Sequence, residues 1–498
     1  MGKLVIKRLK AIVSCDANDT VYENADMLIE DNKIAYIGDM TDGIRRMGAS
    51  MIDGRNMICY PGLINTHHHF YQYFSRNLPQ VQNMELFDLL KTLYEIWKGI
   101  DREIVYCSSA LAMTELMKWG CTTAFDHHYV FPKAAGHLLI DEQFRAADAL
   151  GMRFTASRGS MDLSKKDGGL PPDSVVQTVD EILEDSRRLA AEYHDASFGS
   201  MRTLALAPCS PFSVSGELMK QSALLARELG LRLHTHLAET KDEENYTLAH
   251  FGMKPYDYIE SLGWTGSDVW YAHGIHFTDD ELIRIAKSGS GVAHCPISNM
   301  KLASGVAKVP RMLELGIPVG LAVDGSASND GSNLLEELRV GYLLHRLTSA
   351  EKAPSGYDML KMATVGGAKL LGRGDIGHIA PGMAADMFLV DTRRAELVGA
   401  ALDPKNMLAT VGLKAPVDYA IINGRITIAH RRVITQDEAS LARRGREAVA
   451  RNFGKSKTTK LIPLFSEKYT LKYALYYLKR GFIYELLSFD GRCRAHRL

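Results

Sequence analysis

Residues 61–69, PGLINTHHH, mark the point at which the character of the sequence changes, and they decide the fold that we expect. A Pro-Gly turn leads into a short apolar run that ends in three histidines. The side chains of a strand alternate between two faces, so His67 and His69 point to one side and His68 to the other. Two imidazoles on one face of a strand end can share a metal ion, although an HxH pair alone is weak evidence.

Seven further short apolar runs follow and alternate with longer amphipathic segments. The runs lie at 122–129, 153–160, 203–210, 232–239, 269–277, 291–298 and 319–325. Segments between them, such as 103–120 and 176–194, have apolar residues at helical spacing. Eight strand–helix alternations are the number that closes a ring, so the sequence predicts a distorted (β/α)8 TIM barrel, of class α/β, over residues 59–380.

The segments on both sides of this region have the alternating residue pattern of β-strands. Residues 1–58 contain short alternating runs, and the pattern returns in GMAADMFLVD and VDYAIINGRITIAHRRVI. We expect residues 1–58 and 381–436 to pair into one small β-sandwich domain built from both ends of the chain.

The end of the chain, residues 437–498, is expected to be a helical and basic tail. From Arg451 onward there are eleven Lys or Arg against three Asp or Glu, and LKYALYYLKRGFIYELLSF is amphipathic. A helix docked on the barrel or on a second subunit and a basic helix on a membrane surface both fit this pattern, and the first is favoured.

The bulk composition indicates a globular protein of the cytoplasm. The 498 residues have a formal net charge of zero, which gives no reason to expect a nucleic acid as partner. The seven cysteines include no CxxC pair and fit reduced thiols. The N-terminus lacks the uninterrupted apolar run of a signal peptide, and no stretch approaches the ~20 apolar residues that an integral membrane segment needs.

Three further strand ends carry residues that suit metal chemistry. His236 in HTHLAE adds an imidazole, and Glu239 follows it where a carboxyl can overhang the pocket. A dry pocket raises the pKa of a carboxyl, which suits a group that must carry a proton to the substrate. His273 in YAHG and Asp324 in VDGS end two later strands. These strand ends meet at one rim of a barrel, so the sequence predicts a divalent metal site there.

The ordered set PGLINTHHH, HTHLAE, YAHG, HCPISNMKLASG and VDGSASND resembles the amidohydrolase superfamily, in its branch of cytosine, guanine and triazine aminohydrolases. The resemblance implies that His67, His69, His236 and Asp324 bind one ion, zinc in first place and iron as the alternative. It further implies that Glu239 shuttles a proton and that His273 holds the attacking hydroxide. Many relatives bind a second metal through a Lys on the fourth strand. That strand reads TLALAPCS here, so a single ion is expected.

The ring on which the enzyme acts is less sharply indicated. The block ALAPCSPFSVS, together with HHHFYQ and DHHYVFP, resembles 8-oxoguanine deaminases, and the texture also resembles triazine hydrolases. The candidate substrate-binding residues are Gln72, His128, Cys209 and Asn299. Each has a plain structural alternative, such as a buried histidine, a small apolar cysteine or a loop-stabilising asparagine.

The sequence therefore predicts a metal-dependent aminohydrolase that deaminates a purine-type ring, with 8-oxoguanine to urate plus ammonia as the first choice. An s-triazine amino- or chlorohydrolase of the hydroxyatrazine type, or another purine, pterin or pyrimidine deaminase, is the alternative. The expected partner is a small heterocyclic substrate, and a homo-oligomer is expected.

Overall fold

The computed structural model describes residues 2–40 and 49–452. Beyond Asn452, the predicted basic tail lies outside the described residues. Within the described residues no helix is long and apolar enough to cross a membrane. The six cysteines of this part of the chain are buried and form no disulfide.

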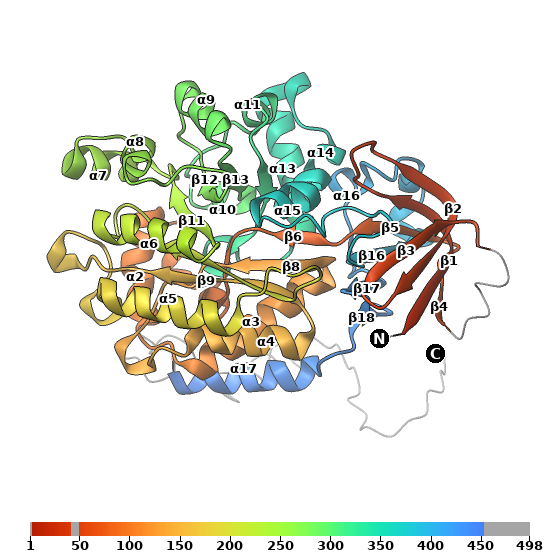
Figure 1. The fold of residues 1–498 in the computed structure, drawn as a ribbon, viewed down its shortest axis with the longest axis horizontal. Helices are drawn as coiled ribbons and strands as arrows, with labels where there is room; N and C mark the ends of the chain where they lie inside the picture. Colours follow the sequence, from red (N-terminus) through yellow and green to blue (C-terminus); the bar gives the residue numbers. More distant parts are fainter. Residues whose placement is uncertain (1, 41–48, 453–498) are drawn as a thin grey trace, which may run out of the picture. The chain divides into compact units, whose positions relative to one another are not determined.

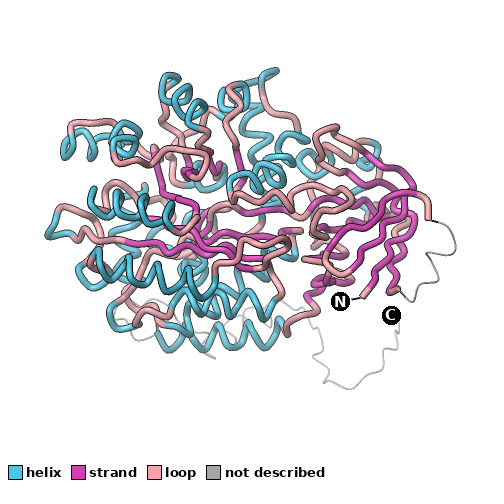
Figure 2. The backbone as a smooth tube through the Cα atoms, in the orientation of Figure 1, coloured by secondary structure: helices cyan, strands magenta, loops and turns pink. Residues whose placement is uncertain are grey.

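A nearly closed parallel barrel forms the larger part of the fold, as the sequence predicts. Eight strands pair in the order β14-β13-β12-β11-β10-β9-β8-β6. Their bounds are β6 Leu63–Asn65, β8 Cys121–Asp126, β9 Arg153–Ser160, β10 Arg202–Pro208, β11 Arg232–Leu237, β12 Val269–His273, β13 Gly291–His294 and β14 Val319–Leu321. Figures 1 and 2 show these strands side by side, with helices on their outer face.

Several of the helices between the strands begin at a side-chain N-cap. Those of the barrel are α3 Arg102–Lys118, α4 Leu139–Leu150, α5 Val179–Tyr193, α6 Gly216–Glu228, α7 Lys241–Phe251, α8 Pro255–Ser261, α9 Asp279–Ser288, α10 Pro296–Lys301, α11 Val309–Glu314, α12 Ser326–Asn329, α13 Leu334–Ser349, α14 Gly356–Lys361 and α15 Gly367–Leu370. Two elements after the first strand, η1 Phe70–Ser75 and α2 Leu86–Trp97, precede α3. Side-chain N-caps such as Asp101 of α3 satisfy backbone N–H groups that a helix leaves free at its start.

The seam between the first and last strands closes the barrel at the metal-binding end. There β7 (His68–His69) pairs in parallel with β15 (Asp324–Gly325). The amide of Asp324 donates to the carbonyl of His67 at 3.1 Å, and the amide of Thr66 reaches the carbonyl of Leu321 at 3.4 Å. The closure therefore brings the carboxylate of the last strand against the histidines of the first.

The second sheet is built from both ends of the chain, as predicted. Its order is β19-β18-β17-β16-β5-β1-β2-β3, with β4 paired to β1. The bounds are β1 Lys3–Val13, β2 Val21–Glu30, β3 Lys33–Gly38, β4 Ser50–Asp53, β5 Met57–Pro61, β16 Met387–Asp391, β17 Tyr419–Ile422, β18 Arg425–Ala429 and β19 Arg432–Val433. The junction is the antiparallel pair β5–β16, which joins the N-terminal strands to the C-terminal ones.

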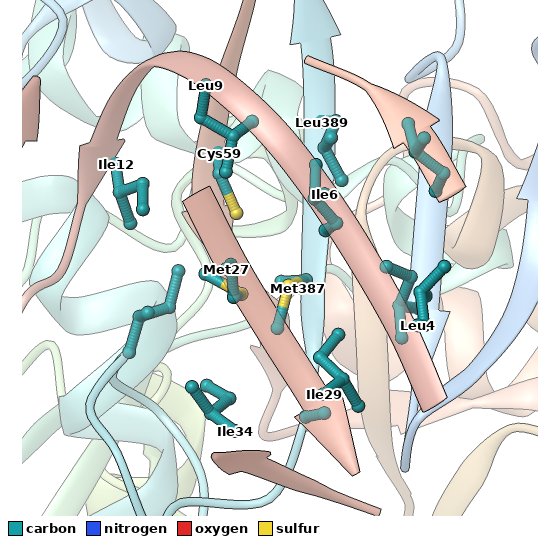
Figure 3. Close-up of a cluster of buried hydrophobic side chains, with 14 of the residues drawn as sticks. Leu4, Ile6, Leu9, Ile12, Met27, Ile29, Ile34, Cys59, Met387 and Leu389 are labelled. Atoms are coloured by element: carbon teal, nitrogen blue, oxygen red, sulfur yellow. The ribbon is translucent and has the colours of Figure 1, made fainter. Parts of the chain in front are cut away.

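One apolar cluster holds the two ends of the chain together in this sheet. Ile6 and Ile29 from the N-terminal strands pack with Met387 and Leu389 from β16, all of them fully buried (Figure 3). Burial of such side chains contributes about 1.5–3 kcal/mol each. Helix α16 (Met407–Thr410) lies between β16 and β17 in the chain, and α17 (Glu438–Asn452) follows β19. The α17 residue Arg444 pairs with Glu103 of α3 at 2.6 Å, which ties this helix to the barrel.

Candidate active site

Four side chains from three strand ends converge at the closing seam of the barrel. The Nε2 atoms of His67 and His69 lie 3.3 and 3.2 Å from Oδ1 of Asp324. The Nε2 atoms of His69 and His236 are 3.2 Å apart. Ligand atoms at the corners of a tetrahedron around a zinc-like ion, with bonds of about 2.0–2.1 Å, are separated by roughly 3.3–3.4 Å. The spacing of these four atoms therefore fits one divalent ion.

A wider set of groups surrounds the same point. The donor atoms of His67, His236, His273 and Asp324 all lie within 4.8 Å of one another, and so do those of His67, His69, His127 and His236. The Nε2 atom of His67 is fully buried and has no hydrogen-bond partner among the described residues. A buried polar atom without a partner is unfavourable, and a bound ion would satisfy it.

Backbone contacts orient two of the three imidazoles, so that their Nε2 atoms face the proposed metal position. The Nδ1 atoms of His69 and His236 each donate to a carbonyl oxygen at 2.7 Å, those of His127 and Cys209. Each ring therefore carries its proton on Nδ1 and presents the lone pair of Nε2 to the centre.

The third imidazole is oriented through another histidine. His234 Nδ1 donates to the carbonyl of Trp270 at 3.0 Å, so its Nε2 accepts from His67 Nδ1 at 2.8 Å. Burial lowers the pKa of His67 to about 3, and it also holds the pKa of His236 well below its usual value. The rings are therefore neutral, which is the form that binds a metal.

Asp324 is oriented by hydroxyl groups. Ser298 and Ser328 donate to its Oδ2 atom at 2.5 and 3.0 Å, which leaves Oδ1 toward the histidines. Its backbone is left-handed, with φ of 63°. A non-glycine residue in this region is strained, and such strain is common where a site must point a side chain in one direction.

Glu239 and His273 lie beside the four metal-facing groups. His273 Nε2 is 3.6 Å from Oε2 of Glu239, and its Nδ1 lies 2.9 Å from Oδ1 of Asn299. Burial, with the charge of Asp324 adding to it, raises the pKa of Glu239 well above that of an exposed carboxyl. Burial therefore favours the protonated form of Glu239, the form that can donate a proton.

A hollow opens onto these groups. Its polar lining residues are His69, Gln72, His236, Glu239, His273, Asp324 and Ser328. Its other lining residues are Leu86, Leu89 and Leu90 of α2 together with Tyr129, Cys209, Phe212 and Leu302. This combination suits a flat heterocycle, because apolar side chains can cover its faces while polar groups contact its edge.

The four predicted substrate-binding residues are placed differently. Gln72 and Cys209 line the hollow, whereas the described lining includes neither His128 nor Asn299. His128 Nε2 donates to the carbonyl of Val130 at 3.0 Å, and its ring packs on Tyr71 and Phe131. Asn299 lies behind His273 and contacts it directly.

Sequence reasoning did not single out several residues of this site. The apolar face of α2 had the spacing of an ordinary packing helix, and Tyr129 simply follows two histidines. His127 and His234 contact the predicted metal-binding histidines: His127 stacks on His236 at a centroid distance of 4.8 Å, and His234 lies 2.8 Å from His67 Nδ1. The HxH spacing of His234 and His236 could have identified His234 from the sequence.

Comparison with known proteins agrees with the fold and the site. The amidohydrolase family profile matches residues 58–427. The chain is similar to the hydroxydechloroatrazine ethylaminohydrolase of Pseudomonas sp. strain ADP, with 40% identity over 444 residues, 87% of this chain and 92% of that protein. It is also similar to the 8-oxoguanine deaminase of Pseudomonas aeruginosa, with 41% identity over 450 residues, 90% of this chain and 99% of the other.

Among solved structures, the atrazine chlorohydrolase of Arthrobacter aurescens TC1 complexed with zinc superposes with a TM-score of 0.86. The identity is 32%, and the match covers 90% of this chain and all of that one. The chain belongs to the amidohydrolase family. It is a hydrolase of carbon–nitrogen bonds with a metal-binding group of histidines and an aspartate, as the sequence predicts.

Proposed function

We propose that this hydrolase deaminates an aminated purine-type heterocycle, with 8-oxoguanine as the first substrate, and releases urate and ammonia. The observation that carries the proposal is the buried Glu239–His273 pair, which faces the hollow next to Asp324. The similarity to an 8-oxoguanine deaminase over nearly all of that protein's length supports the choice of ring.

We further propose that His67, His69, His236 and Asp324 hold one zinc ion. The zinc in a structural relative and the separations of about 3.2–3.3 Å between their donor atoms support this assignment. When bound, the ion would make hydroxide available at neutral pH by lowering the pKa of a water molecule. Iron is the alternative, since the same imidazole and carboxylate ligands accept it.

The chain's own residues would then divide the proton transfers among them. Asp324 accepts the proton of the attacking water on Oδ1, the carboxylate oxygen that faces the histidines. Glu239, whose protonated form is favoured by burial, donates to the ring nitrogen next to the carbon under attack. Asn299 keeps a proton on Nδ1 of His273, which leaves Nε2 to contact the attacking oxygen. The proton held by Asp324 then passes to the amino group, the carbon–nitrogen bond breaks, and ammonia leaves as the tetrahedral centre collapses to the carbonyl.

Gln72 and Cys209 are the residues that we assign to the ring edge, because both line the hollow. Oε1 of Gln72 lies 3.3 Å from the amide of Ala327, so its amino group is left to donate toward the substrate. His128 and Asn299 would affect substrate binding only indirectly, because His128 is hydrogen-bonded to the carbonyl of Val130 and Asn299 to His273.

An s-triazine hydrolase is the second candidate, because the chain is as similar to an ethylaminohydrolase as to an 8-oxoguanine deaminase. A substrate panel separates the two. Ammonia is measured from 8-oxoguanine, guanine, cytosine and isoxanthopterin, and ethylamine is measured by chromatography from hydroxyatrazine. We expect the highest kcat/KM for 8-oxoguanine; a higher value for hydroxyatrazine would reject the purine assignment and support the triazine one.

We also propose a cytoplasmic homo-oligomer that does not bind nucleic acid. The zero net charge supports the absence of a nucleic-acid partner, and the six buried cysteines of the described residues, which form no disulfide, support the cytoplasmic assignment. Light scattering after size-exclusion chromatography tests the oligomeric state, and a mass equal to one chain would reject it.

A further inference from the structure

The start of helix α7 departs from a capping pattern that other helices of the chain follow. Helices α5 and α9 begin with Thr-x-x-Glu and form a reciprocal box. In α9, the hydroxyl of Thr278 accepts the amide of Glu281, and the carboxylate of Glu281 accepts the amide of Thr278 at 2.6 Å. Helix α7 has the same sequence pattern, Thr240 to Glu243, and Thr240 again accepts the amide of the glutamate.

The carboxylate of Glu243, however, does not return to the amide of Thr240. Its Oε1 accepts the amide of Ala238 at 3.0 Å, and its Oε2 accepts the amide of Glu239 at 3.0 Å. The side chain of Glu243 is fully buried. A carboxylate buried beside a second acidic group is unfavourable, so an ordinary cap does not account for its place here.

The peptide group between Ala238 and Glu239 is held at both of its polar atoms. The carbonyl of Ala238 accepts the amides of Ile275 and His276, each at 2.9 Å. The amide of Glu239, in the same peptide plane, is the one that donates to Glu243. Ala238 is left-handed, with φ of 54°, a conformation that an alanine adopts only under such constraint.

We propose that Glu243 is a positioning residue for Glu239. Its two carboxylate oxygens hold the left-handed turn at Ala238, and this turn directs the Glu239 side chain into the hollow beside His273. The inference rests on the proposed function, in which Glu239 transfers the proton. Glu243 itself does not line the hollow, so its effect on the reaction passes through Glu239.

The first test replaces one acceptor oxygen by a donor with almost no change in shape, in Glu243→Gln. One of the two amides then loses its acceptor, and the Glu239 carboxyl shifts. We expect kcat for the best substrate to fall by about 10- to 100-fold, with KM changed less than about threefold and the metal content unchanged. A kcat within about twofold of wild type would overturn the proposal.

Two matched variants separate positioning from simple helix capping. Glu281→Gln makes the same change at the same position of α9, and Thr240→Ala weakens the cap of α7 while it leaves the Glu243 carboxylate in place. Both are expected to lower the melting temperature and leave kcat near wild type. If Glu281→Gln or Thr240→Ala reduces kcat as much as Glu243→Gln does, the effect is one of capping and the proposal fails.

A double-mutant cycle asks whether Glu243 acts through Glu239. In the Glu239→Gln background, the further change Glu243→Gln is expected to leave the residual kcat unchanged, because no proton donor remains to be positioned. If Glu243→Gln lowers kcat in the Glu239→Gln background by the same factor as it does in the wild type, the inference is contradicted. If Glu239→Gln alone keeps wild-type activity, the proposed proton transfer is wrong, which is a separate outcome. Should Glu243→Gln not fold, Glu243→Asp, with both oxygens on a shorter side chain, takes its place in the same comparisons.

Discussion

The contact between Asn299 and His273 gives the most quantitative prediction for the reaction. Both side chains are buried, and Oδ1 of Asn299 lies 2.9 Å from Nδ1 of His273. Asn299→Ala leaves the ring N–H without an acceptor, which costs about 1–3 kcal/mol for a buried donor. If this energy is lost in the transition state, kcat/KM falls roughly 5- to 150-fold, since about 1.4 kcal/mol is a factor of ten.

The assay is steady-state ammonia release, accompanied by metal analysis of the same samples. Metal content should stay at the wild-type value, because Asn299 contacts His273 and none of the four proposed ligands in the contacts described above. Asn299→Asp should retain most of the activity: the carboxylate is also an acceptor, and the amide nitrogen that it replaces has no partner among the described residues. An unchanged kcat/KM in Asn299→Ala, or a loss of metal from it, would refute the role given to His273.

Three further predictions concern the metal, the sheet and the pH dependence of stability. Asp324→Asn should release metal to a chelator faster than wild type and lose turnover with it; full retention of metal would exclude Asp324 as a ligand. In Asp386→Ala, the buried Arg153 loses the carboxylate that lies 2.9 Å from it. The loss of this partner costs about 3–5 kcal/mol of folding stability, which lowers the melting temperature by about 3–5 °C for some 450 residues. A shift below 1 °C would contradict this expectation. Burial raises the pKa of Asp126 to about 7, so the folded state binds its proton more tightly and stability declines as pH rises from about 4 to about 7. Asp126→Asn should flatten that decline, seen by thermal melts across the range, and an unchanged slope would contradict the cause.

Much of the fold follows from local patterns in the sequence. Each barrel strand is short, apolar and followed by an amphipathic helix, and eight such units close a ring. The HxH of the first strand was informative because side chains alternate along a strand, so His67 and His69 had to share a face. Because the strands are parallel, the strand ends that carry His67, His69, His236 and Asp324 were expected to meet at one rim of the barrel.

The finer geometry could not be derived in the same way, because it depends on contacts between distant segments. The sequence predicts that Asn299 binds substrate, because nothing local shows that its oxygen lies 2.9 Å from His273 Nδ1, 26 positions away. The three leucines of α2 had the spacing of core residues, and only the tertiary placement of that helix makes them walls of the hollow. The left-handed backbone of Ala238 likewise accompanies contacts with distant residues, since its carbonyl accepts the amides of Ile275 and His276.

A metal titration of the stripped enzyme tests the central claim most directly. Metal-free protein is reconstituted with increasing zinc, and ammonia release from 8-oxoguanine is measured at each step. The four donor groups of His67, His69, His236 and Asp324 predict that activity rises linearly and reaches its plateau at one zinc per chain. A plateau at two ions per chain, or full activity without any added metal, would contradict the account.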